Sequence, residues 1–152
     1  MKNIGIDLGG TIFSKTNEDT KEQEIYIFPN SFKILSKIVE KFDNVYIISR
    51  VNSQQRERSL AWLNSSEFFK KTGISPNNLF YCFDRRDKAI FGKALELTHF
   101  IDDRPEVLIH LNENIFKILF APKLKNFDDS NLFNLTNYKV VNSWMEIDEV
   151  LF

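Results

Sequence analysis

Short apolar runs alternate with amphipathic segments along most of the chain. The apolar runs have the length of buried strands, and the segments between them repeat apolar residues at helical spacing. This alternation predicts an α/β fold of three layers, in which helices cover both faces of a doubly wound, Rossmann-like and mostly parallel sheet. The expected strands are 2–7, 45–48, 79–83, 99–101, 115–120 and 138–141, and the expected helices are 32–42, 53–63, 84–97, 105–111 and 144–151.

Two polar stretches interrupt this alternation. Residues 11–28 follow the first strand and predict a flap or loose hairpin over its end. Residues 123–137 are polar and irregular. Because no repeat, linker or low-complexity tract separates the elements, the 152 residues are expected to form one domain, 1–152.

Composition narrows the classes of partner and compartment. The 20 basic and 21 acidic residues give a formal charge of -1, which indicates neither a nucleic acid nor a membrane partner. No apolar run approaches the roughly 20 residues of a membrane helix, and no signal peptide follows Met1. The single cysteine, Cys82, excludes an internal disulfide and is typical of a reducing compartment, so a cytoplasmic location is expected. The sequence leaves the oligomeric state open.

The exit of the first strand carries the first candidate chemistry. Asp7 ends the apolar run, and Gly9, Gly10 and Thr11 follow it. Open α/β sheets place their chemistry at the carboxyl ends of strands, so Asp7 is a candidate nucleophile or metal ligand. Glycines allow backbone amides to approach an anion closely, which predicts a phosphate-binding loop. The alternative is that Asp7 only forms a turn.

Polar residues also end two other strands of the predicted sheet. Ser49 follows the second strand, Asp102 and Asp103 end the fourth, and Lys88 begins the helix that leads into the fourth. Because parallel strands share one edge, these side chains are expected to converge on a site for Mg²⁺ and a phosphate. Arg50, next to Ser49, is a candidate for holding a substrate anion.

Each of these residues also has a structural interpretation. Ser49 could cap a turn, and Asp102 with Asp103 could cap a helix. Lys88 could be a solvated helix residue, in which case Lys93 is the alternative lysine for the site.

Four short motifs, in this order, resemble the haloacid dehalogenase superfamily over about residues 2–121. The local pattern is similar to the capless nucleotidase-like and carboxy-terminal-domain-phosphatase-like branches. The resemblance implies a Mg²⁺-dependent hydrolase that acts on a phosphorylated small molecule or macromolecule through a phosphoaspartyl intermediate. The motifs are Asp7-Leu8-Gly9-Gly10-Thr11, Ser49 in Tyr46-Ile47-Ile48-Ser49-Arg50, Lys88 in Arg86-Asp87-Lys88, and Asp102-Asp103 in Phe100-Ile101-Asp102-Asp103-Arg104.

The resemblance also implies a role for each matching residue. Asp7 is the expected nucleophile, assisted by Ser49 and Lys88. The expected metal ligands are Asp7, the backbone carbonyl of Gly9 and Asp103, with Asp102 in support. The expected phosphate binders are Gly9, Gly10, Thr11, Ser49 and Lys88, and Arg50 is added to them because of its position next to Ser49.

One position departs from the family pattern. Phosphatases of this family carry a second Asp two residues after the nucleophile as general acid and base, and this chain has Gly9 there. Such catalysis typically contributes about 10²–10⁴-fold, so low or atypical activity is expected.

Two alternatives from other functional classes remain. The first is a catalytically degenerate module that binds a phosphorylated partner, which Gly9 favours. The second is a fragment of a sugar kinase with the actin-like fold, whose opening phosphate loop is similar. That fold needs further glycine-rich loops, whereas only Gly73 and Gly92 follow Gly10.

Overall fold

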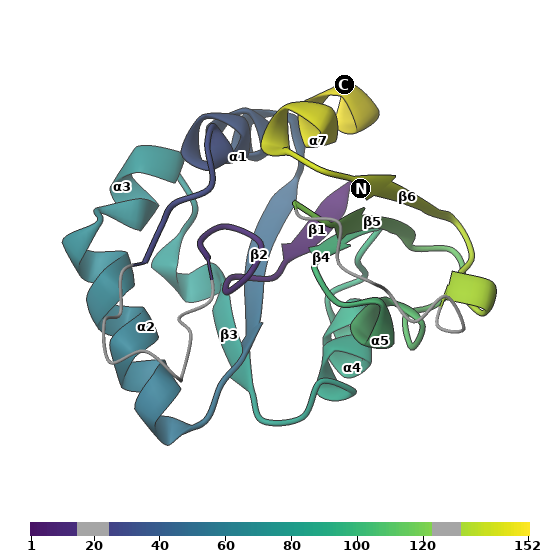
Figure 1. Cartoon of the computed structure of the whole chain (residues 1–152), viewed down its shortest axis with the longest axis horizontal. Coiled ribbons are helices and arrows are strands. Elements are labelled where there is room, and N and C mark those ends of the chain that lie inside the picture. Colours follow the sequence, from purple (N-terminus) through teal and green to yellow (C-terminus); the bar gives the residue numbers. More distant parts are fainter. Residues whose placement is uncertain (15–24, 123–131) are drawn as a thin grey trace.

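Six parallel strands and the helices that cover them form the architecture of the computed structural model, which describes residues 1–14, 25–122 and 132–152 (Figure 1). The strand order is β3-β2-β1-β4-β5-β6, and each neighbouring pair is parallel. The predicted α/β fold is therefore confirmed. The strands are β1 (Asn3–Ile6), β2 (Asn44–Arg50), β3 (Leu79–Cys82), β4 (His99–Asp102), β5 (Phe116–Phe120) and β6 (Tyr138–Val141). The helices are α1 (Ser31–Lys41), α2 (Ser53–Ser65), α3 (Phe68–Thr72), the 3₁₀ turn η1 (Pro76–Asn78), α4 (Asp87–Ala94), α5 (Pro105–Leu108) and α7 (Trp144–Leu151).

The direction in which the chain winds reverses at β1. From β1 the sheet grows through β2 and β3 on one side, and the chain then returns to add β4, β5 and β6 on the other. Open α/β sheets bind ligands at the carboxyl ends of the strands where this reversal occurs. The ends of β1 and β4 are therefore the expected place for a site.

Alternation along the strands divides the apolar side chains between two cores. Ile47 and Ile101 pack with residues of α1, α2, α3 and α7 on one face of the sheet. Ile48 and Phe100 pack on the other face with residues of α4 and α5 (Figure 1). Because both faces are covered, the strands are apolar along nearly their whole length until they reach the carboxyl edge.

Some helix bounds differ from those expected. Helix α4 begins at Asp87 rather than 84, because Asp84 forms a turn in which its Oδ1 accepts a hydrogen bond from Arg86 N at 2.9 Å. Helix α5 ends at Leu108 rather than 111. The short helix α3 was not expected, and it is separated from α2 at Glu67, whose φ of 56° is left-handed.

The two irregular stretches are described in part. The ends of 11–28 pair as the expected hairpin would: Ser14 N donates to Tyr26 O at 2.7 Å, and Phe28 N donates to Ile12 O at 3.0 Å. Residues 15–24 of that stretch and residues 123–131 of the second lie outside the described residues. Among the helices of the described ranges, none combines the length and hydropathy needed to cross a bilayer.

A buried lysine lies at the amino-terminal edge of the sheet, opposite the edge where the site is expected. Lys117, near the start of β5, is 1% exposed. Its Nζ donates to three backbone carbonyls, those of Asn112 at 3.1 Å, Ile115 at 2.9 Å and Thr136 at 3.1 Å. One ammonium therefore ties the segment before β5 to the segment before β6.

Replacing Lys117 by methionine should lower the free energy of unfolding by about 2–6 kcal/mol, because the carbonyls of Ile115 and Thr136 lose their donor at about 1–3 kcal/mol each, whereas Asn112 O still accepts from Ile115 N. Urea denaturation at pH 7 measures the loss. Lys139→Met is the matched control, since Lys139 is exposed on β6. Equal stability of the two variants would contradict the role given to Lys117.

Candidate active site

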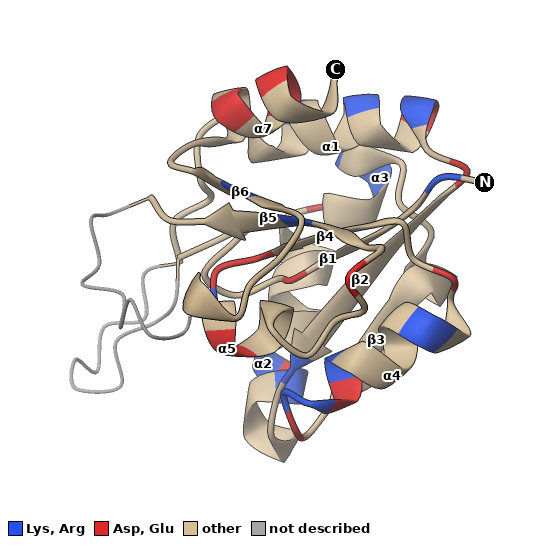
Figure 2. Cartoon of the chain, turned by 90° about the vertical axis from the view of Figure 1, so that its right-hand side faces the viewer, with Lys and Arg blue, Asp and Glu red and all other residues tan. Residues whose placement is uncertain are grey.

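Asp7 lies at the point where β1 and β4 end side by side. Its backbone N donates to Ile101 O at 2.9 Å and so continues the pairing of Ile6 with Ile101. By this register Asp102 is the neighbour of Asp7 on β4. The two residues are only 6% and 0% exposed, respectively. Figure 2 shows the acidic segments at the ends of β1 and β4 on the same side of the sheet.

Lys88 joins these two carboxylates from the first turn of α4. Its Nζ donates to Asp7 Oδ1 at 2.9 Å and to Asp102 Oδ2 at 2.8 Å. Lys88 is itself 2% exposed, so the three charges meet almost without water. The remaining Oδ1 of Asp102 accepts a hydrogen bond from Arg104 N at 3.0 Å, which fixes the orientation of that carboxylate.

Asp103 completes an acidic cluster with Asp7 and Asp102. One carboxylate oxygen from each of the three residues lies within 4.8 Å of the others, and all three residues are buried. Oxygen ligands at this spacing suit a hard divalent cation such as Mg²⁺. The structure thus brings together Asp7, Lys88, Asp102 and Asp103, which come from three separate parts of the sequence.

The loop after Asp7 turns sharply around the carbonyl of Leu8. This oxygen accepts hydrogen bonds from Ile12 N at 2.9 Å and from Thr11 N at 3.3 Å. The turn requires Gly10, whose φ of 88° is left-handed. The hydroxyl of Thr11 donates to Asp7 Oδ2 at 3.1 Å, so both oxygens of Asp7 are held.

The amides of this loop are engaged within the chain. Gly10 N donates to Phe13 O at 2.7 Å, and Thr11 N donates to Leu8 O. The predicted phosphate binders Gly10 and Thr11 therefore lie in the loop after Asp7. To bind an anion, their N–H groups would have to give up or share their hydrogen bonds to the carbonyls of Phe13 and Leu8.

Ser49 and Arg50 are the last two residues of β2, the strand next to β1. Ile47 pairs with Ile6, so Ser49 is one position beyond the level of Asp7 on β2, where it is buried. Arg50 is exposed, and its Nε donates to Phe83 O at 3.2 Å, toward β3. The described contacts do not bring Arg50 into the acidic cluster.

Burial sets the electrostatics of the cluster. Burial raises the pKa of Asp7, and Lys88 only partly opposes this effect. Burial, with the charge of Asp7, also raises the pKa of Asp102 to about 6. Burial disfavours the charge of Lys88, but Asp102 and Asp7 together raise its pKa above the ordinary value.

These shifts indicate that the cluster lacks positive charge. Three carboxylates and one ammonium give a formal charge of -2, from 3 negative and 1 positive groups. A divalent cation would neutralise this charge. The donor set therefore fits Mg²⁺ both in ligand type and in charge.

Without metal, the raised pKa of Asp102 makes stability depend on pH. The folded state holds this proton more tightly than the unfolded state, so stability should fall as the pH rises from about 4 to about 6. The contribution amounts to about 3 kcal/mol at 1.36 kcal/mol per pKa unit. Urea denaturation in EDTA at several pH values measures it.

Asp102→Asn should reduce this fall in stability. Asp84→Asn is the control, because Asp84 is exposed and the hydrogen bond from Arg86 N lowers its pKa. A slope unchanged in Asp102→Asn would show that another group titrates.

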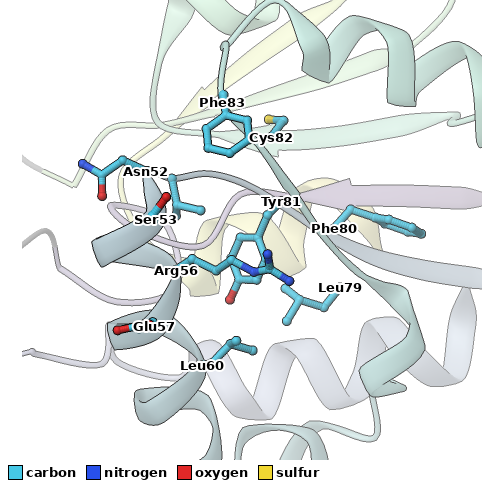
Figure 3. A pocket seen from close by; sticks show the side chains of 11 residues that line it. Asn52, Ser53, Arg56, Glu57, Leu60, Leu79, Phe80, Tyr81, Cys82 and Phe83 are labelled. Carbon is cyan, nitrogen blue, oxygen red and sulfur yellow. The ribbon is translucent and has the colours of Figure 1, made fainter.

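A separate groove lies between α2 and β3, with a volume of about 550 Å³ (Figure 3). Arg56 lies over the ring of Tyr81 at 5.7 Å from its centroid, and the Tyr81 hydroxyl donates to Ser59 Oγ at 2.9 Å. None of the residues that line it belongs to the acidic cluster. The groove is therefore not the site predicted from the sequence.

One contact of the loop after Asp7 was not foreseen. The indole Nε1 of Trp144 donates to Thr11 O at 2.8 Å across 133 residues of sequence. A tryptophan among apolar residues is predicted to lie in the core, and nothing in its neighbourhood signals a partner at residue 11.

Comparisons with known proteins identify one sequence relative and several structures of the same fold. No protein-family model matches the chain. A protein of Oceanobacillus iheyensis named "Putative nucleotidase OB0422" is 25% identical over 126 residues, which cover 76% of this chain and 65% of the relative. The chain thus spans slightly less than two thirds of that relative.

Two solved structures share the fold along 99% of this chain. One is D,D-heptose 1,7-bisphosphate phosphatase from B. bronchiseptica, solved with magnesium and phosphate, with a TM-score of 0.68, 12% identity and 98% of its chain covered. The other is the cobalt-bound deoxy-D-mannose-octulosonate 8-phosphate phosphatase from Haemophilus influenzae, with a TM-score of 0.60, 12% identity and 86% of its chain covered. At such identities the likeness establishes the fold.

Proposed function

We propose that this chain, which has the haloacid dehalogenase fold of these phosphatases, is a hydrolase that removes phosphate from an ester with Asp7 as nucleophile and Mg²⁺ as cofactor. The buried cluster of three carboxylates around one lysine carries the proposal. The alignment with phosphatases along 99% of the chain leaves no support for the actin-like kinase. The substrate is a phosphorylated small molecule or macromolecule.

The residues of the cluster have distinct tasks in this reaction. A carboxylate oxygen of Asp7 attacks phosphorus, and the bond to the leaving oxygen breaks to give a phosphoaspartyl group. Water then attacks this phosphorus, and the bond to Asp7 breaks to release phosphate and restore the carboxylate. Lys88 places a positive charge beside Asp7, and Asp102 holds Lys88 there. The Thr11 hydroxyl orients the second oxygen of Asp7.

Mg²⁺ would be held by Asp7, Asp103 and the carbonyl of Gly9, with Asp102 in support. When bound, the cation offsets the charge of the carboxylates and of the phosphoryl oxygens. Ser49 is proposed as a further phosphate binder at the end of β2.

The absence of a general acid at Gly9 determines which substrates are favoured. An alkyl leaving group departs as a strongly basic alkoxide and needs a proton. An aryl or acyl phosphate has a leaving group that is stable without one. We therefore expect turnover of aryl phosphates in the presence of Mg²⁺ and little turnover of alkyl phosphates.

Replacing Gly9 by aspartate should raise kcat for alkyl phosphates by about 10²–10⁴-fold, because it supplies the missing acid. The structure accommodates a side chain here, since a Cβ on Gly9 would lie 3.7 Å from the ring of Phe13, an ordinary contact. Steady-state assays with a matched pair of aryl and alkyl phosphates measure the change.

Gly9→Ala is the control, because it adds the Cβ without a carboxyl group. An equal gain in both variants would contradict the assignment of a missing acid. If wild type turns over no ester in a broad panel while still binding phosphate with Mg²⁺, the chain is a phosphate-binding module instead.

A further inference from the structure

The hydrogen bond from Trp144 links the last helix to the loop that carries the nucleophile. Trp144 is the first residue of α7 and is 1% exposed. Ser143 caps this helix, its Oγ accepting from Glu146 N at 3.2 Å, so the start of α7 is well defined. The ring of Trp144 also packs on Phe120 of β5, with centroids 6.2 Å apart.

The sheet topology explains how so distant a residue reaches the loop. β6 is parallel to the other strands, so α7 begins at the carboxyl edge where β1 ends. β6 is three strands from β1, about 14 Å at the usual spacing of strands. The indole of Trp144 packs on Phe120, which covers part of this distance, and its N–H donates to the carbonyl of Thr11.

The carbonyl of Thr11, which accepts the hydrogen bond from Trp144, belongs to the peptide unit between Thr11 and Ile12. The amide N of Ile12 in the same peptide unit donates to Leu8 O at 2.9 Å. Thr11 in turn donates its hydroxyl to Asp7 Oδ2. A rotation of this peptide unit would therefore disturb both the turn and the hydrogen bond to Asp7.

We propose that Trp144 is a positioning residue for Asp7, acting through the carbonyl of Thr11. This inference depends on the proposed function, since it assigns Trp144 a part in setting the nucleophile. Loss of its N–H leaves a buried carbonyl without its donor and frees the loop, and small misplacements of reacting groups can cost about 10²-fold in rate.

Trp144→Phe tests this role, because phenylalanine keeps an aromatic ring but has no N–H. Hydrogen exchange of the amides of Ile12 and Phe13 should become at least about 10-fold faster, and kcat for an aryl phosphate with Mg²⁺ should fall by about 10- to 100-fold with a smaller change in KM. Phe120→Leu is the matched control: it alters the same core without a polar contact to the loop, and it should change neither quantity to this extent.

The outcomes separate this inference from the proposed function. Loop exchange unchanged in Trp144→Phe, or equal effects in Phe120→Leu, would overturn the inference while wild-type turnover stands. Faster exchange with unchanged kcat would overturn it as well. If wild type has no turnover, the proposed function fails, and with it the part of Trp144 in catalysis.

A measurement on the wild-type protein covers the case in which Trp144→Phe does not fold. The chain has two tryptophans, so ¹⁵N NMR should give two indole signals, assigned with a Trp62→Phe variant. The Trp144 signal should shift when Mg²⁺ and beryllium fluoride are added. No shift on saturation with both would overturn the inference.

Discussion

Replacing Asp7 by asparagine should lower turnover of an aryl phosphate with Mg²⁺ by about 10⁴-fold or more, because the amide cannot form the phosphoaspartyl bond. The substitution preserves shape, and Lys88 keeps its bond to Asp102 at 2.8 Å, so the fold should persist. Steady-state kinetics on purified variants measure the loss, and circular dichroism checks the fold.

Asp43→Asn provides the matched control, since Asp43 is exposed and follows α1 at the opposite edge of the sheet. It should retain full activity. Residual turnover in Asp7→Asn close to that of wild type would mean that another group attacks phosphorus, and the proposed role of Asp7 would fail.

Replacing Lys88 by methionine should lower the free energy of unfolding by about 3–5 kcal/mol, because it leaves buried carboxylates without their ammonium. Both partners of Lys88, Asp7 and Asp102, are less than one tenth exposed and cannot turn to solvent. Urea denaturation at pH 7 in EDTA measures the loss. The deficit should shrink toward pH 5, where Asp102 takes up a proton.

Lys93→Met is the control on the same helix. Lys93 is exposed on α4, so its loss should leave stability nearly unchanged. This pair also tests which of the two lysines that the sequence offers belongs to the buried cluster. Similar losses in both variants would contradict the buried charge network.

The convergence of the site could be predicted because it follows from the sheet. Asp7 and Asp102 end runs of apolar residues, and parallel strands bring such ends to one edge. Lys88 could be placed near them because it begins the helix that leads into β4. These inferences need only strand direction and order along the chain.

Other features depend on contacts that leave no local signal. The bond from Trp144 to Thr11 depends on where α7 docks, which apolar spacing does not specify. Glu67 separates α3 from α2 by adopting a left-handed φ, which glutamate rarely does, so the sequence gives no sign of this break. The position of Arg50 next to Ser49 predicts a role in holding a substrate anion, whereas in the structure its side chain donates to the carbonyl of Phe83.

The span of the Trp144 bond also bears on the order in which the protein folds. Contacts between residues far apart in sequence require closure of a long chain segment, and they tend to form late. β1 can pair with its neighbours before α7 has docked, but the loop after Asp7 then lacks its hydrogen bond from Trp144. If Asp7 acts as proposed, a folding intermediate with a complete central sheet but an undocked α7 would not yet catalyse the reaction.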